Sequence, residues 1–124
     1  MMHVIAIGVG GALGSVLRYW MSTWVHALAG RGFPYGTLAV NVLGCLAMGF
    51  LFVLLVERLS NDTVLRAGLL IGLLGGFTTF SSLSIETFSL IEQGAWLKAG
   101  VNTLASVLLC VGATWIGVIA GRAL

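Results

Sequence analysis

Hydrophobic residues fall into four long stretches, about residues 4–28, 35–56, 64–91 and 95–123, which short polar segments separate. Each stretch exceeds the ~20 residues with which a helix crosses a hydrocarbon layer of ~30 Å. No stretch alternates strictly between apolar and polar positions, as a half-buried strand would. The pattern therefore predicts an all-α protein, with four membrane-spanning helices in a single membrane domain of residues 1–124.

The polar segments between the stretches are short and mark the expected loops. They cover residues 30–34, 57–62 and 92–94. Pro34, the only proline, suits a loop or the first turn of the second helix, because proline lacks the N–H that this turn would leave unpaired.

Glycines recur at four-residue spacing inside the apolar stretches. Small residues at this spacing let helix backbones approach closely in lipid. The sequence therefore predicts close helix–helix packing at several pairs, namely Gly10 and Gly14, Gly68 and Gly72, Gly72 and Gly76, and Gly117 and Gly121.

Composition agrees with the membrane assignment. Of the 124 residues, 59% are hydrophobic and 8% charged, and the mean hydropathy is +1.09. Soluble domains average about 25% charged residues, and disordered chains need low hydrophobicity. The net charge of +2 rests on six scattered Lys and Arg residues, so we expect no nucleic-acid partner. No catalytic motif is present, which predicts that the protein is not an enzyme.

The basic residues do not fix one orientation in the membrane. The positive-inside rule compares Lys and Arg near the two ends of the spans, and here it finds three against two or three. The count sets Arg58, Arg66 and Arg122 against Arg31, Lys98 and, if it leans that way, Arg18. Ordinary weak bias is one interpretation. The other is insertion in both orientations, which would permit an antiparallel dimer of two inverted copies.

The centre of the third stretch is a poor helix former. Gly75 and Gly76 are followed by two threonines and three serines within residues 78–84. This composition predicts a break near residues 75–79. A break would free backbone carbonyls for a cation, while the following half-helix would direct amides toward an anion. The alternative is a continuous helix in which the small residues pack against neighbours.

Two side chains beside the predicted break have chemistry suited to an anion. Phe80 carries a positive ring edge that faces an anion without binding it too strongly. Asn41, in the second stretch, either joins two helices by hydrogen bonds or offers its amide N–H to an anion.

Polar residues of the fourth stretch recur every four positions along one face: Asn102, Ser106, Cys110 and Thr114. They form a stripe that suits the lining of a narrow path, although such hydroxyls often bond their own backbone. The other cysteine, Cys45, is expected to pack as a small hydrophobic residue, and no disulfide framework is expected.

Two charged residues lie within the stretches, where charges are costly and suggest function. Arg18 lies near the end of its stretch, so it either reaches the interface, pairs structurally or forms an anion-attracting vestibule. Glu86 is either a proton carrier or a hydrogen-bonding partner for a helix end or loop.

Three sequence runs together resemble the Fluc (CrcB-type) fluoride channel family. They are GGFTTFS at 75–81, GGALGSVLRY at 10–19 and PYGTLAVNVLG at 34–44. The first is highly specific to that family and the other two moderately so. The resemblance covers essentially the whole chain, at the length and span count of the family.

The resemblance implies a passive, fluoride-selective channel that exports cytoplasmic fluoride across the cell inner (plasma) membrane. Family members are antiparallel, dual-topology homodimers with two fluoride pores and a structural Na⁺ at the dimer centre. The positions of the motif imply that backbone carbonyls of Gly75 and Thr78 from both subunits hold this ion.

The resemblance also implies which residues form the fluoride pathway: Asn41, Phe80, Ser81, Leu83, Ser106, Cys110 and Thr114. Leu83 stands where the family has a second phenylalanine, and Cys110 where it has a serine. Asn102 replaces a tyrosine common in the family, and Arg18 and Glu86 match its charged positions.

Two other functions remain as alternatives. A small multidrug-resistance-type proton-coupled transporter has a similar size and span count, but it needs a carboxylate in the first helix, where this chain has Arg18. A packing subunit of a larger membrane complex would need neither the break nor the polar stripe.

Overall fold

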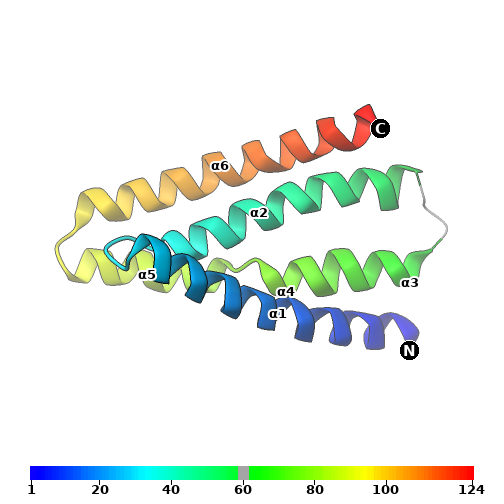
Figure 1. Cartoon of the computed structure of the whole chain (residues 1–124), viewed down its shortest axis with the longest axis horizontal. Helices are drawn as coiled ribbons and strands as arrows, with labels where there is room; N and C mark the ends of the chain where they lie inside the picture. Colours follow the sequence, from blue (N-terminus) through cyan, green and yellow to red (C-terminus); the bar gives the residue numbers. More distant parts are fainter. Residues whose placement is uncertain (59–61) are drawn as a thin grey trace.

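The computed structural model describes residues 1–58 and 62–124, and this part of the chain is helical, without strands (Figure 1). Residues 59–61 of the predicted 57–62 loop lie outside the described residues. In chain order, the elements are α1 (Met2–Ala29), α2 (Tyr35–Phe52), the π-helix η1 (Val53–Arg58), α3 (Thr63–Arg66), the π-helix η2 (Ala67–Leu74), α4 (Gly75–Phe77), α5 (Phe80–Glu92) and α6 (Trp96–Ala123).

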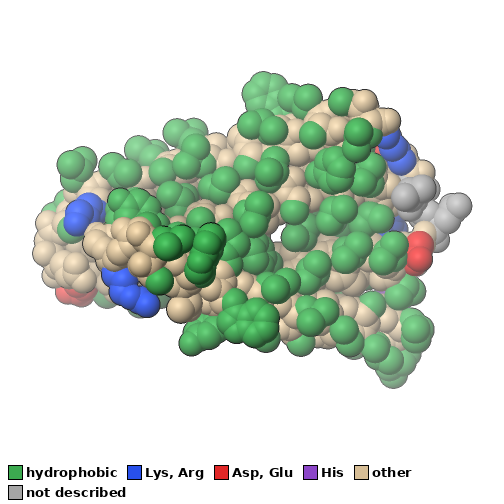
Figure 2. Space-filling model, in the orientation of Figure 1, with side chains coloured by type: hydrophobic (Ala, Val, Ile, Leu, Met, Phe, Trp, Pro, Cys, Tyr) green, Lys and Arg blue, Asp and Glu red, His purple; other side chains and the backbone are tan. Residues whose placement is uncertain are grey.

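These elements make four helical segments long and apolar enough to cross a membrane: Met2–Ala29, Tyr35–Arg58, Thr63–Glu92 and Trp96–Ala123. Their ends lie within two residues of the ends predicted from the sequence. Hydrophobic side chains cover the middle of the molecule in Figure 2, and the visible charged groups lie toward its two ends. The chain is therefore a multi-pass, all-α membrane protein.

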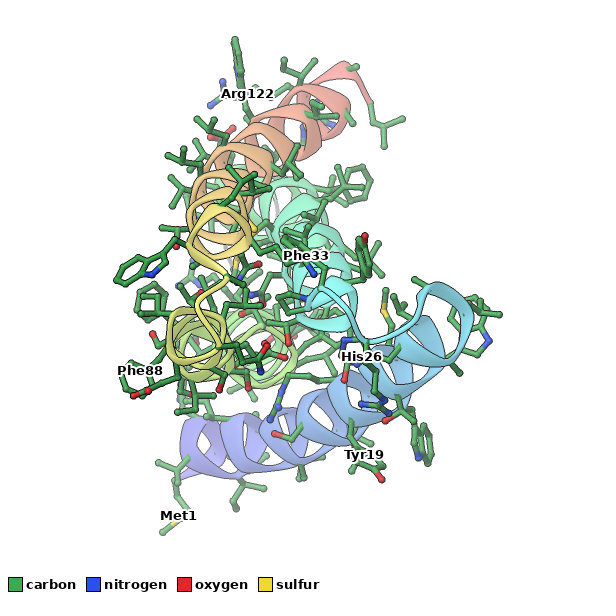
Figure 3. The ribbon with its side chains drawn as sticks, turned by 90° about the vertical axis from the view of Figure 1, so that its left-hand side faces the viewer. Met1, Tyr19, His26, Phe33, Phe88 and Arg122 are labelled. Atoms are coloured by element: carbon green, nitrogen blue, oxygen red, sulfur yellow. The ribbon has the colours of Figure 1, made fainter. Side chains whose placement is uncertain are left out.

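The four spans run up and down, so that both termini lie at one end of the molecule (Figure 1). The turns 30–34 and 93–95 lie at the other end. Gly30 and Gly94 occupy these turns with positive φ of 87° and 78°, a region that residues with a Cβ rarely adopt. Viewed along the helices, α2 lies between α1 and α6, and the third span packs beside it (Figure 3).

Glycines bring α1 into backbone contact with the third span, as their spacing predicts. A Cβ on Gly10 would collide with the carbonyl of Gly68, and one on Gly76 would lie 2.7 Å from the carbonyl of Gly11. The same holds between α2 and α6, where a Cβ on Gly117 would collide with the carbonyl of Leu46. Close packing at these glycines therefore fixes the positions of the helices.

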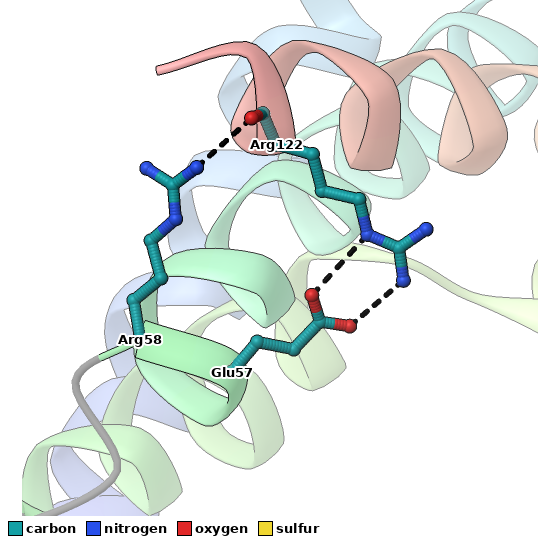
Figure 4. A network of polar contacts seen from close by, with 3 residues as sticks. All are labelled: Glu57, Arg58 and Arg122. Carbon is teal, nitrogen blue, oxygen red and sulfur yellow. Dashed lines mark hydrogen bonds and ion pairs between the residues drawn. The ribbon is translucent and has the colours of Figure 1, made fainter.

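An ion pair joins the ends of the second and fourth spans (Figure 4). Arg122 donates from Nε and Nη2 to the two carboxylate oxygens of Glu57, at 3.2 and 2.9 Å, and Arg58 donates to the Arg122 carbonyl at 2.9 Å. All three groups are exposed, so we assign them a small part in stability.

Two residues in the middle of the third span leave the helical conformation. Thr78 has φ −83° and ψ 154°, and Thr79 has φ −151° and ψ 124°, so both are extended. They separate α4 from α5, and the linking trace is visible in Figure 1.

Candidate functional site

A groove of about 300 Å³ lies where α2, the start of α5 and α6 meet. Its lining consists of Asn41, Cys45, Thr78, Thr79, Phe80, Leu83, Ser106, Val107, Cys110 and Val111. The groove thus brings the two extended threonines together with polar side chains from the second and fourth spans.

Asn41 is bonded to both backbone groups of Thr79. Its Nδ2 donates to the Thr79 carbonyl at 2.9 Å, and its Oδ1 accepts from the Thr79 N–H at 2.8 Å. A side-chain amide has one donor and one acceptor face, so it can replace the partners that an extended residue loses inside a helix. Asn41, which is 7% exposed, therefore holds the extended segment in place.

This bond changes the pairing of the carbonyls before Thr79. In a continuous helix, the Thr79 N–H would bond to the carbonyl of Gly75, but here it is taken by Asn41. Thr78 instead donates twice to the Leu74 carbonyl, from its N–H and its hydroxyl, both at 3.0 Å. At the end of α4, the Leu74 carbonyl therefore accepts two hydrogen bonds, whereas the Gly75 carbonyl lacks its helical partner.

Arg18 reaches the same helix end from α1. Its Nε donates to the Gly76 carbonyl at 3.2 Å, and the side chain is half-buried. The structure therefore agrees with a pairing role for this arginine, one of the three interpretations that the sequence left open.

The helix α5 begins at the groove with a side-chain cap. The Thr79 hydroxyl accepts from the Ser82 N–H at 3.2 Å and shares a hydrogen bond of 3.2 Å with the Ser81 hydroxyl. A capped helix start presents a partial positive charge, which favours an anion nearby.

The α6 wall of the groove includes a buried hydroxyl. Ser106 is 3% exposed, and its Oγ has no hydrogen-bond partner among the described residues. One turn earlier, the buried Asn102 donates to the Thr87 hydroxyl at 2.9 Å and so ties α6 to α5. An unpaired buried hydroxyl is costly, which makes Ser106 the polar group of the groove most in need of a ligand.

Five of the seven pathway residues predicted from the sequence line this groove: Asn41, Phe80, Leu83, Ser106 and Cys110. The other two lie beside it. The Ser81 side chain is exposed and bonded to Thr79, while the Thr114 hydroxyl donates to the Cys45 carbonyl at 3.2 Å. The structure thus gathers most of the set and places two members outside the lining.

Glu86 lies in a second cavity, of about 350 Å³, near the end of the molecule that carries the 30–34 turn. Basic side chains share this cavity, namely His26, Arg31 and Lys98. Within the described chain, Oε1 of Glu86 is buried without a hydrogen-bond partner. The carboxylate is thus separate from the groove, in a cavity that it shares with two cationic side chains, Arg31 and Lys98.

Sequence reasoning missed two members of the groove besides the apolar Val107 and Val111. Thr79 was treated as part of the predicted break, although its backbone groups are the partners of Asn41. Cys45 was assigned to packing, yet it lies four residues after Asn41 on the same helix face. Helical spacing was the available signal for Cys45, whereas no sequence pattern marks the pairing of Asn41 with Thr79.

The groups available for a cation near the break are backbone carbonyls. Among the described residues, no group of three His, Cys, Asp or Glu side chains is arranged to hold a metal. Gly75 is exposed on the surface of the single chain, and its carbonyl has lost the helical partner that Thr79 would provide. Na⁺ is a hard cation that prefers oxygen ligands, so the carbonyl oxygens of Gly75 and Thr78 are of the type that fits this ion.

Comparison with known proteins gives a consistent result over the whole chain. The family model described as "CrcB-like protein, Camphor Resistance (CrcB)" matches residues 5–118. The "Fluoride-specific ion channel FluC" of Coxiella burnetii (strain Dugway 5J108-111) is 52% identical over 124 residues, covering 99% of this chain and all of that protein. The proteins of the same name from Geobacter sulfurreducens and Geobacter metallireducens are 50% and 48% identical, covering 100% and 98% of both chains.

Proposed function

Because the chain belongs to the CrcB-like protein family, we propose that it is a fluoride-selective ion channel. Its relatives are named as ion channels, which are not enzymes. The groove beside the extended threonines is the candidate fluoride path. The observation that carries this assignment is the buried, unpartnered hydroxyl of Ser106 in the wall of that groove.

The groove offers fluoride what a small, strongly hydrated anion requires. Fluoride leaves water readily only if hydrogen-bond donors of the protein replace its hydration shell. The Ser106 hydroxyl supplies one donor, and the capped start of α5 adds a partial positive charge. The ring edge of Phe80 adds a weaker attraction, which suits a station that an ion must also leave.

We propose that two copies assemble as an antiparallel homodimer around this groove. Phe80 lines the groove but is 77% exposed in the single chain, and the surface of a second copy would cover its ring. The nearly balanced basic residues at the two ends of the spans support insertion in both orientations.

The same dimer supports a structural Na⁺ at its centre. The carbonyls of Gly75 and Thr78 would hold the ion, and each copy contributes two oxygens, too few for a hard cation on their own. Bound Na⁺ would supply a fixed positive charge that holds the two interrupted helices together. Arg18, on the neighbouring Gly76 carbonyl, fixes the helix end beside that site.

The proposed transport is passive, and the proposed location is the cell inner membrane. A cytoplasm more alkaline than its surroundings dissociates entering HF, and a negative membrane potential then drives fluoride outward through an anion path. Nothing in this scheme consumes a proton gradient. It therefore differs from a proton-coupled transporter, in which Glu86 would have to carry the proton, and from a packing subunit, which would conduct nothing.

The test is fluoride release from cells that lack their own fluoride exporters, followed with a fluoride electrode. Cells making the protein should release fluoride, and Ser106→Ala should slow this release, since a lost hydrogen bond to a charged group, worth about 1.5–3 kcal/mol, lowers fluoride occupancy of the groove about ten- to hundredfold. Thr103→Val on the same helix is the control, because the Thr103 hydroxyl bonds its own backbone at Ala99. Equal release with and without the protein would refute the proposal.

A further inference from the structure

Two thiols line the groove from two different helices. Cys45 comes from α2 and Cys110 from α6, and both are free. Each lies one helical turn after another residue of the lining, Asn41 on α2 and Ser106 on α6. The two helices run in the same direction (Figure 1).

The helices that carry the two thiols are packed against each other close to the cysteines. The Thr114 hydroxyl, one turn after Cys110, donates to the Cys45 carbonyl at 3.2 Å. Just beyond, a Cβ on Gly49 would collide with the carbonyl of Thr114, so the two backbones are in contact at this level. The pair therefore belongs to two packed helices and not to a loop.

The chemistry of this pair suits a soft metal ion with two ligands. Thiolates prefer soft ions, and tetrahedral zinc needs about four ligands. Within the described residues, no third His, Cys, Asp or Glu completes such a group. The pair therefore suits an ion that accepts linear coordination by two sulfurs, as Hg²⁺, Cu⁺ and Ag⁺ do. A divalent ion is favoured, because M²⁺ + 2 RSH → M(SR)₂ + 2 H⁺ leaves the complex neutral in an apolar groove.

We propose that Cys45 and Cys110 form a two-thiolate binding site for a soft metal ion such as Hg²⁺. The bound ion lies between α2 and α6, inside the groove, and replaces both thiol protons. A second consequence, which rests on the proposed function, is that the bound metal obstructs fluoride.

Binding is tested on the purified protein with HgCl₂ and excess glutathione as a competing thiol. Native mass spectrometry should show one mercury per chain with two protons lost, and both cysteines should resist alkylation by N-ethylmaleimide. Cys45→Ser and Cys110→Ser, which leave one thiol each, should lose the metal to glutathione at least tenfold more readily. Two mercury ions per chain, or equal retention in the single variants, would overturn the site.

Obstruction is tested separately by fluoride efflux from proteoliposomes, with each variant compared with its own untreated rate. Hg²⁺ should stop efflux through the unmodified chain and leave the rate of Cys45→Ser unaffected once glutathione is added. If mercury binds both thiols but the unmodified chain never releases fluoride, the proposed function fails and the metal site stands. If efflux is fast and continues with mercury on both thiols, obstruction is wrong.

Discussion

At the scale of single residues, Asn41 is the side chain on which the groove depends most. One amide supplies both hydrogen bonds of an extended backbone residue that would otherwise be unpaired inside a membrane protein. Of its two predicted roles, the structure shows the joining of helices, because the bonds of Asn41 to Thr79 connect α2 with the third span beside the groove. Its service to an anion stays a prediction.

Two substitutions of Asn41 test the hydrogen bonds that it makes to the backbone of Thr79. Asn41→Ala removes both and should lower the free energy of unfolding by about 1–3 kcal/mol, the cost of leaving buried polar groups unpaired. Asn41→Asp, when ionised, keeps the acceptor for the Thr79 N–H but places a buried charge against the Thr79 carbonyl, so it should also be less stable than the original. Chemical unfolding in detergent gives the values. An alanine variant as stable as the original would contradict this role.

Leu83 gives a second prediction at this scale. It lines the groove where a phenyl ring would present a positive edge to an anion, and leucine has none. Leu83→Phe should therefore raise the fluoride efflux rate about two- to tenfold, since such ring contacts are worth about 0.5–1.5 kcal/mol. Leu83→Met is the control, because it fills a similar volume without a ring. Equal rates for the two variants would show that ring chemistry is irrelevant here.

The sequence identified the chemistry of individual residues better than their partners. The sequence singles out Asn41 as a polar side chain inside an apolar stretch, Phe80 as an aromatic ring beside the predicted break, and Ser106 and Cys110 by their four-residue spacing. The partner of Asn41 lies 38 positions away, and the partner of Arg18 lies 58 positions away. Both partners are backbone atoms, which carry no sequence signal.

At the scale of the elements, the four spans were predictable because apolar length decides them. The two π-helical segments, Val53–Arg58 and Ala67–Leu74, were not predicted. A π-helix shifts the hydrogen-bond register by one residue while keeping the same apolar side chains, so the hydrophobic pattern scarcely changes. The glycine spacing, by contrast, predicted helix contacts correctly, because only glycine removes the Cβ that keeps backbones apart.

The contact between α2 and α6 gives the prediction that belongs to this scale. Gly117→Ala places a Cβ against the Leu46 carbonyl and should destabilise the protein by about 1–3 kcal/mol, as overpacking does. Gly112→Ala is a matched control on the same helix, because a Cβ there meets nothing within 4 Å. Unfolding measurements on both variants check the difference, and equal stability would show that the helices are not in contact there.

At the scale of the whole molecule, the distribution of charge bears on how the chain enters the membrane. Basic residues lie at both ends, and the ion pair of Glu57 with Arg122 cancels two charges at one of them. Neither end is distinctly more positive, so we predict that the chain inserts in both orientations.

Orientation is measurable with a protease-cleavable tag after Leu124. In sealed inside-out vesicles, about half of the tags should be cleaved if both orientations form equally, since the positive-inside rule then favours neither. Adding two lysines after Leu124 should favour one orientation and so shift the cleaved share away from one half. This variant serves as the control for the assay. Complete cleavage or complete protection of the original chain would rule out dual insertion and, with it, the antiparallel dimer.

The most direct measurement of the central proposal is anion efflux from proteoliposomes loaded with fluoride or with chloride. Valinomycin sets the membrane potential, and ion-selective electrodes follow each anion. The account predicts rapid release of fluoride and retention of chloride, because the buried Ser106 hydroxyl and the capped start of α5 suit a small anion in a narrow groove. Retention of both anions by a folded protein, or equal release of both, would contradict it.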